Sequence, residues 1–391
     1  RDLSENKLHY ILLGDPAMQL ALPRPRMVID SINGVALSSK SEAEPFVLPA
    51  GSSVHITGRV LSADMQTTDT LFNGTVSATV KDAEQLIICN DWDKCGTQFE
   101  YLDNNIVVYN GKNKITKGRF DVNFAVPLDI IYSDDSNGQM FFFGVNEDSV
   151  PQTVNTRFED YQLNTSSDIE NDSIGPAIYC YLNNPKFMNG DEVNPTPYFY
   201  AEVKDEDGIN ASGSSIGHDM LLVIDGDMFK TYNLNNRFVY DFGTYQSGYL
   251  SFSIPELVPG PHTLMFRAWD ILNNSSSVEL KFNVVRGLDS KIYNIYAQQN
   301  PARYYTQFVL QHDRPNSPID VTFEVFDMQG RRVWHNEERN VYSDGTYYLK
   351  WDLCTDSDQQ VGTGVYLYRA KIISDGGCET VKAQKLIVLR Q

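Results

Sequence analysis

The chain has 391 residues and a formal net charge of −19, with 32 Lys and Arg residues against 51 Asp and Glu residues. It has no Lys/Arg stripe to neutralise nucleic-acid phosphates and no apolar run of the about 18 residues that a membrane helix needs. We therefore expect no nucleic-acid partner and no membrane insertion by this chain. The length predicts about two to four domains, and the 22 Tyr, 20 Phe and 26 Gly residues favour strands and turns over helices.

Residues 1–23 differ in pattern from the rest of the chain. Tyr10–Gly14 is a short apolar run of the kind that forms a strand buried on both faces, and Asp15-Pro16 ends it. No matching parallel-sheet pattern follows nearby. We interpret residues 1–23 as the C-terminal remnant of a domain that lies upstream.

Residues 24–165 show the alternation of apolar and polar residues that is typical of antiparallel sheets with one solvated face. Asn-Gly pairs such as Asn33-Gly34 and Asn110-Gly111 predict turns between the runs. We predict one β-sandwich here. The clearest alternating runs are Val54–Val60, Val76–Val80, Phe120–Val126 and Met140–Val145.

Two further modules follow. The polar stretch Asn164–Asn171 reads as a linker, and the density of short strands in residues 170–286 predicts an immunoglobulin-like sandwich. Arg286–Ser290 is a second short linker, after which residues 291–391 predict a third sandwich. The fold class is thus all-β: three β-sandwich (Ig-like) domains in series after a short remnant of an α/β domain.

One stretch has the spacing of a cation site. Asp205, Asp207 and Asn210 alternate around Gly208, and oxygen ligands spaced in this way can wrap a hard cation such as Ca²⁺. Ile216 stands at the twelfth position, where an EF-hand loop has an acidic residue. A plain Asp/Gly turn is the alternative interpretation.

The cysteines and histidines offer little catalytic chemistry. Five cysteines are present, with no spacing that fits a zinc site. A Cys–His nucleophile pair needs both side chains within hydrogen-bond reach, and Cys180 with His218 or His262 is the combination to examine. A buried thiol and unrelated imidazoles are the alternative, and we predict no catalytic residue and no further cofactor in this chain.

Several long stretches resemble a known family. Lys7–Pro23 resembles the last stretch of the gingipain-type (C25) cysteine peptidase domain, and residues 1–285 resemble the region after that domain in the type IX secretion system sortases. The final module is similar to the FlgD-like Ig C-terminal domain of that secretion system. The matching stretches are Gly118–Ile130, Lys204–Met220, Pro259–Ser276, Val325–Val333, Gly345–Asp352, Gly364–Ala370 and Lys385–Val388.

The resemblance implies a non-catalytic scaffold or docking region of a cell-surface gingipain-like cysteine peptidase, whose catalytic Cys and His lie upstream of Lys7. The parent protein would be a cysteine endopeptidase that processes the C-terminal signal domains of exported proteins in a Bacteroidetes-type, Gram-negative bacterium. It would be cell-surface, outer-membrane-associated or periplasmic. Expected partners are secretion-machinery or cargo proteins and the chain's own upstream peptidase domain. The alternative is a stand-alone surface adhesin or glycan-binding protein, which would need an aromatic platform on an exposed sheet face.

Overall fold

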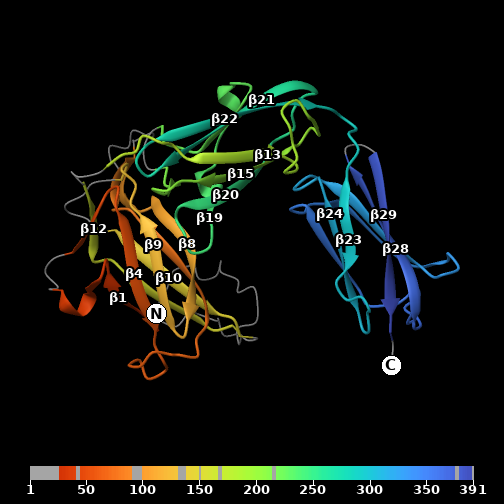
Figure 1. Ribbon diagram of the computed structural model, residues 1–391, viewed down its shortest axis with the longest axis horizontal. Coiled ribbons are helices and arrows are strands. Elements are labelled where there is room, and N and C mark those ends of the chain that lie inside the picture. Colours follow the sequence, from red (N-terminus) through yellow and green to blue (C-terminus); the bar gives the residue numbers. More distant parts are fainter. Residues whose placement is uncertain are drawn as a thin grey trace, which may run out of the picture.

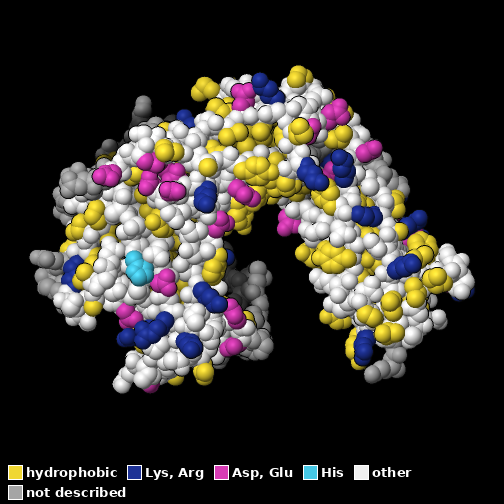
Figure 2. Space-filling view, viewed as in Figure 1, with side chains coloured by type: hydrophobic (Ala, Val, Ile, Leu, Met, Phe, Trp, Pro, Cys, Tyr) yellow, Lys and Arg dark blue, Asp and Glu magenta, His cyan; other side chains and the backbone are white. Residues whose placement is uncertain are grey.

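A computed structural model gives the fold of the chain (Figure 1). It describes residues 26–40, 45–89, 99–130, 138–148, 151–165, 170–213, 217–374 and 378–389. Three β-modules follow one another along an arch: the first module covers residues 26–165, the second 170–285 and the third 291–389. The arch leaves a concave side between the first and third modules (Figures 1 and 2).

The first module is built on an eight-stranded sheet in the order β11-β10-β5-β8-β9-β4-β1-β2. Its strands alternate buried and exposed residues, because one face packs on the core and the other is open. A parallel pair, β12 and β3, and a hairpin, β6 and β7, complete it. The bounds are β1 (Met27–Ile32), β2 (Val35–Ala36), β3 (Phe46–Pro49), β4 (Ser53–Val60), β5 (Gly74–Lys81), β6 (Gln85–Cys89), β7 (Phe99–Asp103), β8 (Val107–Thr116), β9 (Arg119–Ala125), β10 (Gln139–Asn146), β11 (Thr153–Phe158) and β12 (Tyr161–Asn164), with one 3₁₀ turn at Leu37–Ser39.

The second module packs two sheets face to face. One has four strands in the order β13-β15-β20-β19, and the other has the order β14-β22-β21-β17-β18 with β16 paired to β21. The bounds are β13 (Ala177–Leu182), β14 (Glu192–Val193), β15 (Tyr198–Lys204), β16 (Ile209–Asn210), β17 (Leu221–Ile224), β18 (Thr231–Asn233), β19 (Val239–Tyr240), β20 (Ser247–Ser253), β21 (Gly260–Asp270) and β22 (Ser275–Val284), with 3₁₀ turns at Met228–Lys230 and Asn235–Arg237.

The third module pairs a three-stranded sheet, β23-β24-β27, with a four-stranded sheet, β26-β25-β28-β29. Its core is its own and is centred on Phe308, whose ring lies between 4.7 and 6.2 Å from four other aromatic rings. The bounds are β23 (Ile292–Ala297), β24 (Thr306–His312), β25 (Ile319–Phe326), β26 (Arg332–Val341), β27 (Thr346–Trp351), β28 (Gly364–Ser374) and β29 (Cys378–Val388).

The first two modules share one hydrophobic core. A single cluster of buried side chains runs from Met27 in β1 to Val284 in β22. At the seam, the ring of Tyr109 lies 5.0 Å from that of Tyr240 and stacks on Phe124 at 5.6 Å. Backbone hydrogen bonds also cross the seam, such as that from Leu128 to the carbonyl of Ile271 at 2.8 Å. Because apolar burial holds this joint, we treat the two modules as one packed body.

The hydroxyl of Tyr109 occupies the space that a side chain at position 111 of β8 would need. A Cβ at position 111 would stand 1.9 Å from this oxygen, so Gly111 is required by space. The hydroxyl is buried without a hydrogen-bond partner among the described residues, and burial raises the pKa of Tyr109 to about 12. The first module thus keeps one buried polar group unsatisfied at its seam with the second.

Replacing Tyr109 by phenylalanine should therefore raise the free energy of unfolding by up to about 1 kcal/mol, because an unsatisfied buried hydroxyl costs about 1–3 kcal/mol. Gly111→Ala should lower it, since Tyr109 must move. Urea denaturation of both variants against the parent chain measures the two effects. A Tyr109→Phe variant that is destabilised by 1 kcal/mol or more would contradict this account and imply a bound partner for the hydroxyl.

The prediction of an all-β chain built from β-sandwiches is confirmed. The Asn33-Gly34 turn is also confirmed, since both residues have positive φ and connect β1 to β2. The turn predicted at Asn110-Gly111 is wrong, because both residues lie inside β8. The remnant predicted for residues 1–23 lies outside the described residues, and the exact domain boundaries stay predictions. In the described part of the chain, no helix has the length and apolarity to span a membrane.

Candidate functional site

Three carboxylates meet at the joint between the first and second modules. Asp172, Asp207 and Asp270 each place an oxygen within 4.8 Å of the others. Asp172 precedes β13, Asp207 lies in the loop after β15, and Asp270 is the last residue of β21. Asp270 is fully buried, and its carboxylate accepts hydrogen bonds from Leu272, Asn274 and the Asn274 side chain.

The surroundings of this cluster disfavour negative charge. Burial, followed by the nearby charge of Asp270, raises the pKa of Asp205 to about 6. Burial and the charges of Asp172 and Glu206 raise the pKa of Asp207. Burial also raises the pKa of Asp270, with a further contribution from Asp207. Groups that repel one another in this way are typical of sites that attract protons or cations.

The structure brings together only part of the calcium site predicted from the sequence. Asp207 joins the cluster, and Asp205 lies beside it, with one oxygen accepting the backbone N–H groups of Asp207 and Gly208. Asn210 is used elsewhere: its amide donates to Asp129 at 2.8 Å and its oxygen accepts from Ser212. The calcium site stays a prediction, and a calcium titration followed by thermal unfolding tests it.

The raised pKa of Asp205 predicts a specific pH dependence. Its carboxyl titrates near 3.8 in the unfolded chain and near 6 in the fold. Between these values the folded chain binds more protons, so the free energy of unfolding should fall as the pH rises from about 4 to about 6. Two pKa units correspond to about 3 kcal/mol, which water reduces to about 1 kcal/mol at this half-buried carboxyl.

Asp205→Asn should therefore become more stable relative to the parent chain by about 1 kcal/mol between pH 4 and pH 7. Denaturant unfolding at several pH values gives the difference directly. Asp121→Asn, which removes an exposed carboxylate of β9, is the control. A difference between Asp205→Asn and the parent that stays constant over this range would exclude Asp205 as the cause.

The candidate Cys–His pair is not assembled. Cys180 lies in β13, opposite Ala201 of β15, and burial raises the pKa of its thiol to about 11. His262 lies in the other sheet, with Nδ1 2.8 Å from Asp225 and Nε2 2.8 Å from the carbonyl of Val258. His218 has Nδ1 3.2 Å from Asp129 and its ring against Trp269. Neither histidine is engaged with Cys180, whose environment keeps the thiol protonated.

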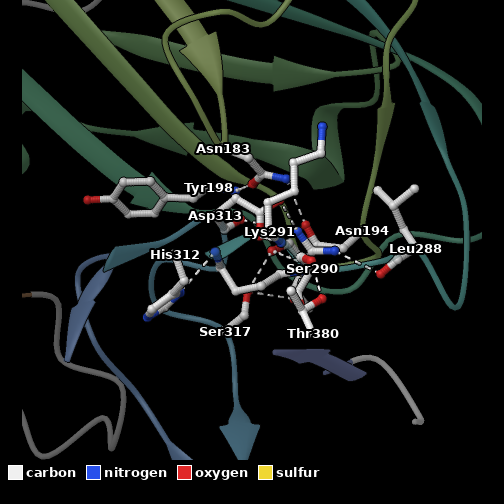
Figure 3. A network of polar contacts seen from close by, with 12 residues as sticks. Asn183, Asn194, Tyr198, Leu288, Ser290, Lys291, His312, Asp313, Ser317 and Thr380 are labelled. Carbon is white, nitrogen blue, oxygen red and sulfur yellow. Dashed lines mark hydrogen bonds and ion pairs between the residues drawn. The ribbon is translucent and has the colours of Figure 1, made fainter. Parts of the chain in front are cut away.

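A second polar centre joins the second module to the third (Figure 3). Asn194 is fully buried and bridges the two modules: it accepts from the amide of Asn183 at 2.9 Å, and its own amide donates to Thr196 and to Ser317. Ser317 comes from the loop before β25 and donates to the carbonyl of Thr196 at 3.2 Å. This joint is therefore held by hydrogen bonds, in contrast to the apolar seam between the first two modules.

Buried charges lie directly behind this joint. Arg314, 1% exposed, pairs with Asp313 at 2.9 Å and donates to the carbonyl of Leu288 in the linker at 2.8 Å. Asp313 also accepts the backbone N–H of Lys291 at 2.7 Å, so the pair is tied to the middle of the linker and to the residue directly after it. Burial and the neighbouring Arg314 lower the pKa of His312 to about 4, which keeps its ring neutral at physiological pH.

Sequence reasoning missed this second centre. His312, Asp313 and Arg314 form a polar run that begins at the last residue of β24, and such a run also looks like the start of an ordinary surface loop. A run of three charged or titratable residues followed by Pro315 was the available signal. This pattern does not show whether the ion pair of Asp313 and Arg314 is buried or exposed.

Comparisons with known proteins give one informative result. No family model and no curated protein matches the chain. Among solved structures, dimeric latent PorU from Porphyromonas gingivalis is 32% identical over 97% of this chain, with a TM-score of 0.45. The match covers 35% of the PorU chain, so this chain spans about a third of that length. The chain is thus similar in sequence to a part of PorU.

Two other solved structures match at lower identity. A tetra-tandem repeat in the extending region of a large adhesion protein is 13% identical, with a TM-score of 0.21, over 88% of this chain and 73% of its own. Escherichia coli alpha-2-macroglobulin activated by porcine elastase is 11% identical, with a TM-score of 0.20, over 95% of this chain and 35% of its own. These two matches carry no argument about function.

Proposed function

We propose that this chain is the non-catalytic scaffold and docking region of a cell-surface, gingipain-like cysteine peptidase of the PorU type. The observation that supports it most strongly is the 32% identity to PorU over 97% of the chain. In this proposal the peptidase domain is a separate part of the parent protein, and the third module is its FlgD-like C-terminal domain. The parent protein works at the surface or in the periplasm of a Gram-negative bacterium.

The two kinds of joint suit a scaffold. An apolar core fuses the first and second modules, whereas hydrogen bonds through Asn194 and Ser317 attach the third module. The first two modules, packed as one body, can hold the peptidase domain in a fixed position. The polar joint lets the third module reorient and contact a partner. The proposed partners are secretion-machinery proteins, cargo proteins and the peptidase domain itself.

The coding sequence upstream of Arg1 provides the first test. The proposal expects a domain with a peptidase Cys–His pair there, and a domain of another kind would overturn it. A binding test then uses that peptidase domain, expressed separately and mixed with this chain. Co-elution in gel filtration is the expected result, and independent elution at high concentration would contradict the scaffold role.

Activity assays of the isolated chain provide a second test. Incubated with a cargo protein that carries a C-terminal signal domain, the chain should leave the cargo intact, because Cys180 is a protonated thiol that neither His218 nor His262 contacts. Turnover that disappears in Cys180→Ala would show that the chain is itself a peptidase. Turnover that persists in Cys180→Ala would reveal a contaminating enzyme, which mass spectrometry of the preparation identifies.

A further inference from the structure

The outer face of one sheet in the second module is dominated by tyrosine. In the four-stranded sheet, Tyr179 and Tyr181 of β13 share this face with Tyr200 of β15 and Tyr249 of β20. Their rings are in contact: Tyr181 and Tyr200 stack at 5.0 Å, and Tyr200 and Tyr249 stack at 5.9 Å. The other positions of the β20 part of the face are serines. Tyr179 remains 50% exposed and Tyr249 40% exposed, so the face is open to solvent.

Glu202 lies in the middle of these tyrosines. On β15 it stands directly opposite Tyr179 on one side and Tyr249 on the other, and Tyr200 donates a 3.4 Å hydrogen bond to it. Cross-strand neighbours have Cβ atoms about 5 Å apart, so both flanking rings are within reach of whatever contacts the carboxylate. Glu202 is exposed and has no ion pair within the described part of the chain.

The tyrosine hydroxyls are held in their neutral form. Burial, together with the charge of Glu202, raises the pKa of Tyr181 to about 12 and raises that of Tyr200 further above its ordinary value. The face therefore carries the carboxyl group of Glu202 surrounded by neutral rings. Lys204, two positions further along β15, is the only cationic side chain that these three strands place on this face, and it forms no ion pair with Glu202 there.

The surface continues towards the third module. Burial, then the charge of Asp313 and to a smaller extent the hydroxyl of Tyr181, raise the pKa of Tyr293 of β23 to about 12. Figure 2 shows side chains of the hydrophobic class, which there include tyrosine, gathered on the concave side of the arch below β13 and β15 of Figure 1. The end of the face at Tyr181 is thus two residues from Asn183, which belongs to the polar joint between the second and third modules.

We propose that Glu202 and the tyrosines around it bind the guanidinium group of an arginine-bearing segment of a protein partner. The carboxylate supplies the opposite charge, and Tyr179 and Tyr249 supply aromatic surface on which a cation is stabilised. Arginine fits better than lysine because its planar group stacks on rings while it donates two hydrogen bonds to one carboxylate. A surface of tyrosine and serine is also typical of protein-recognising faces.

The charge of the whole chain supports a basic partner. With a net charge of −19, the chain attracts positively charged segments before they make contact. The tyrosine face would then provide the specific binding site. An oligosaccharide would need ring faces lying open to stack on. A neutral sugar also gains no attraction from the carboxylate of Glu202 at the centre of these rings, which favours the cation.

The test uses a fluorescein-labelled hexapeptide in which arginine alternates with serine, with binding to the whole chain measured by fluorescence anisotropy. The parent chain should bind it about 5- to 30-fold more tightly than the same peptide with citrulline, the neutral analogue of arginine. Glu202→Gln should lose a similar factor, and Tyr249→Ala about fivefold. Equal binding of the arginine and citrulline peptides, or full binding by Glu202→Gln, would overturn the proposal.

Two controls separate this site from general attraction to an acidic chain. Glu147→Gln removes an exposed carboxylate of the first module and should leave the affinity unchanged, whereas an equal loss would show that binding is unspecific. A lysine peptide that binds as tightly would overturn the choice of arginine. Displacement of the peptide by maltohexaose would identify a sugar site instead. Thermal unfolding of each variant verifies that the fold is intact.

Discussion

Replacing Arg314 by methionine should lower the free energy of unfolding of the third module by about 3–5 kcal/mol. Arg314 is 1% exposed and pairs with Asp313, which is also buried. The substitution leaves the carboxylate of Asp313 buried without its opposite charge and leaves the carbonyl of Leu288 without its donor. An uncompensated buried charge is among the most costly single changes in a protein.

Urea denaturation followed by tryptophan fluorescence measures this loss, since Trp334 and Trp351 both report on the third module. Arg286→Met is the matched control: its pair with Glu256 is exposed on both sides, so its removal should cost about 0–1 kcal/mol. The double variant Asp313→Asn with Arg314→Met should recover part of the stability. If it were no more stable than Arg314→Met alone, the stranded carboxylate would not be the cause.

Phe308→Ala should cost about 3–5 kcal/mol, again in the third module. Phe308 is fully buried, and its ring contacts Phe323 at 5.2 Å, Tyr368 at 4.7 Å and Trp351 at 6.0 Å. Truncation therefore leaves a cavity between the two sheets and removes several aromatic contacts at once. Tyr304→Ala, at a side chain that is 79% exposed, should change the stability by less than about 0.5 kcal/mol.

Tryptophan fluorescence during urea denaturation also measures the loss of stability in Phe308→Ala. Arg314→Met tests a buried ion pair of the third module, and Phe308→Ala tests its aromatic packing. Phe308→Leu keeps most of the volume and should lose clearly less than Phe308→Ala. A loss below 1 kcal/mol for Phe308→Ala would mean that the two sheets close over the missing ring, and that this aromatic cluster does not hold them together.

The alternation of apolar and polar residues predicted the strands well, because burial of one sheet face leaves a local trace. Val54–Val60 and Val76–Val80 lie within β4 and β5. Glycine was harder to interpret. Gly111, inside β8, leaves room for the hydroxyl of Tyr109. The turn after β8 is formed by Lys117-Gly118, both with positive φ. The sequence shows where a glycine is, but a fold is needed to show which neighbour requires it.

The candidate sites were predictable only where their residues are close in sequence. The spacing of Asp205 and Asp207 points to a cation-binding loop, whereas Asp172 and Asp270 reach it through the pairing of distant strands. Glu202 is a further example. Tyr179 and Tyr249 become its neighbours through the registers of β13 and β20 with β15, which no local pattern in the sequence encodes.

The two joints have opposite consequences for where the chain can be divided. Cutting it between residues 165 and 170 would leave the facing rings of Tyr109 and Tyr240 in water, and both fragments would be prone to aggregate. Cutting it between Arg286 and Ser290 would expose mainly polar groups, such as Asn194, Ser317 and the Arg314–Asp313 pair, which water hydrates readily. The polar joint is therefore where an evolving gene could exchange the third module, or a protease release it, without damage to the remainder.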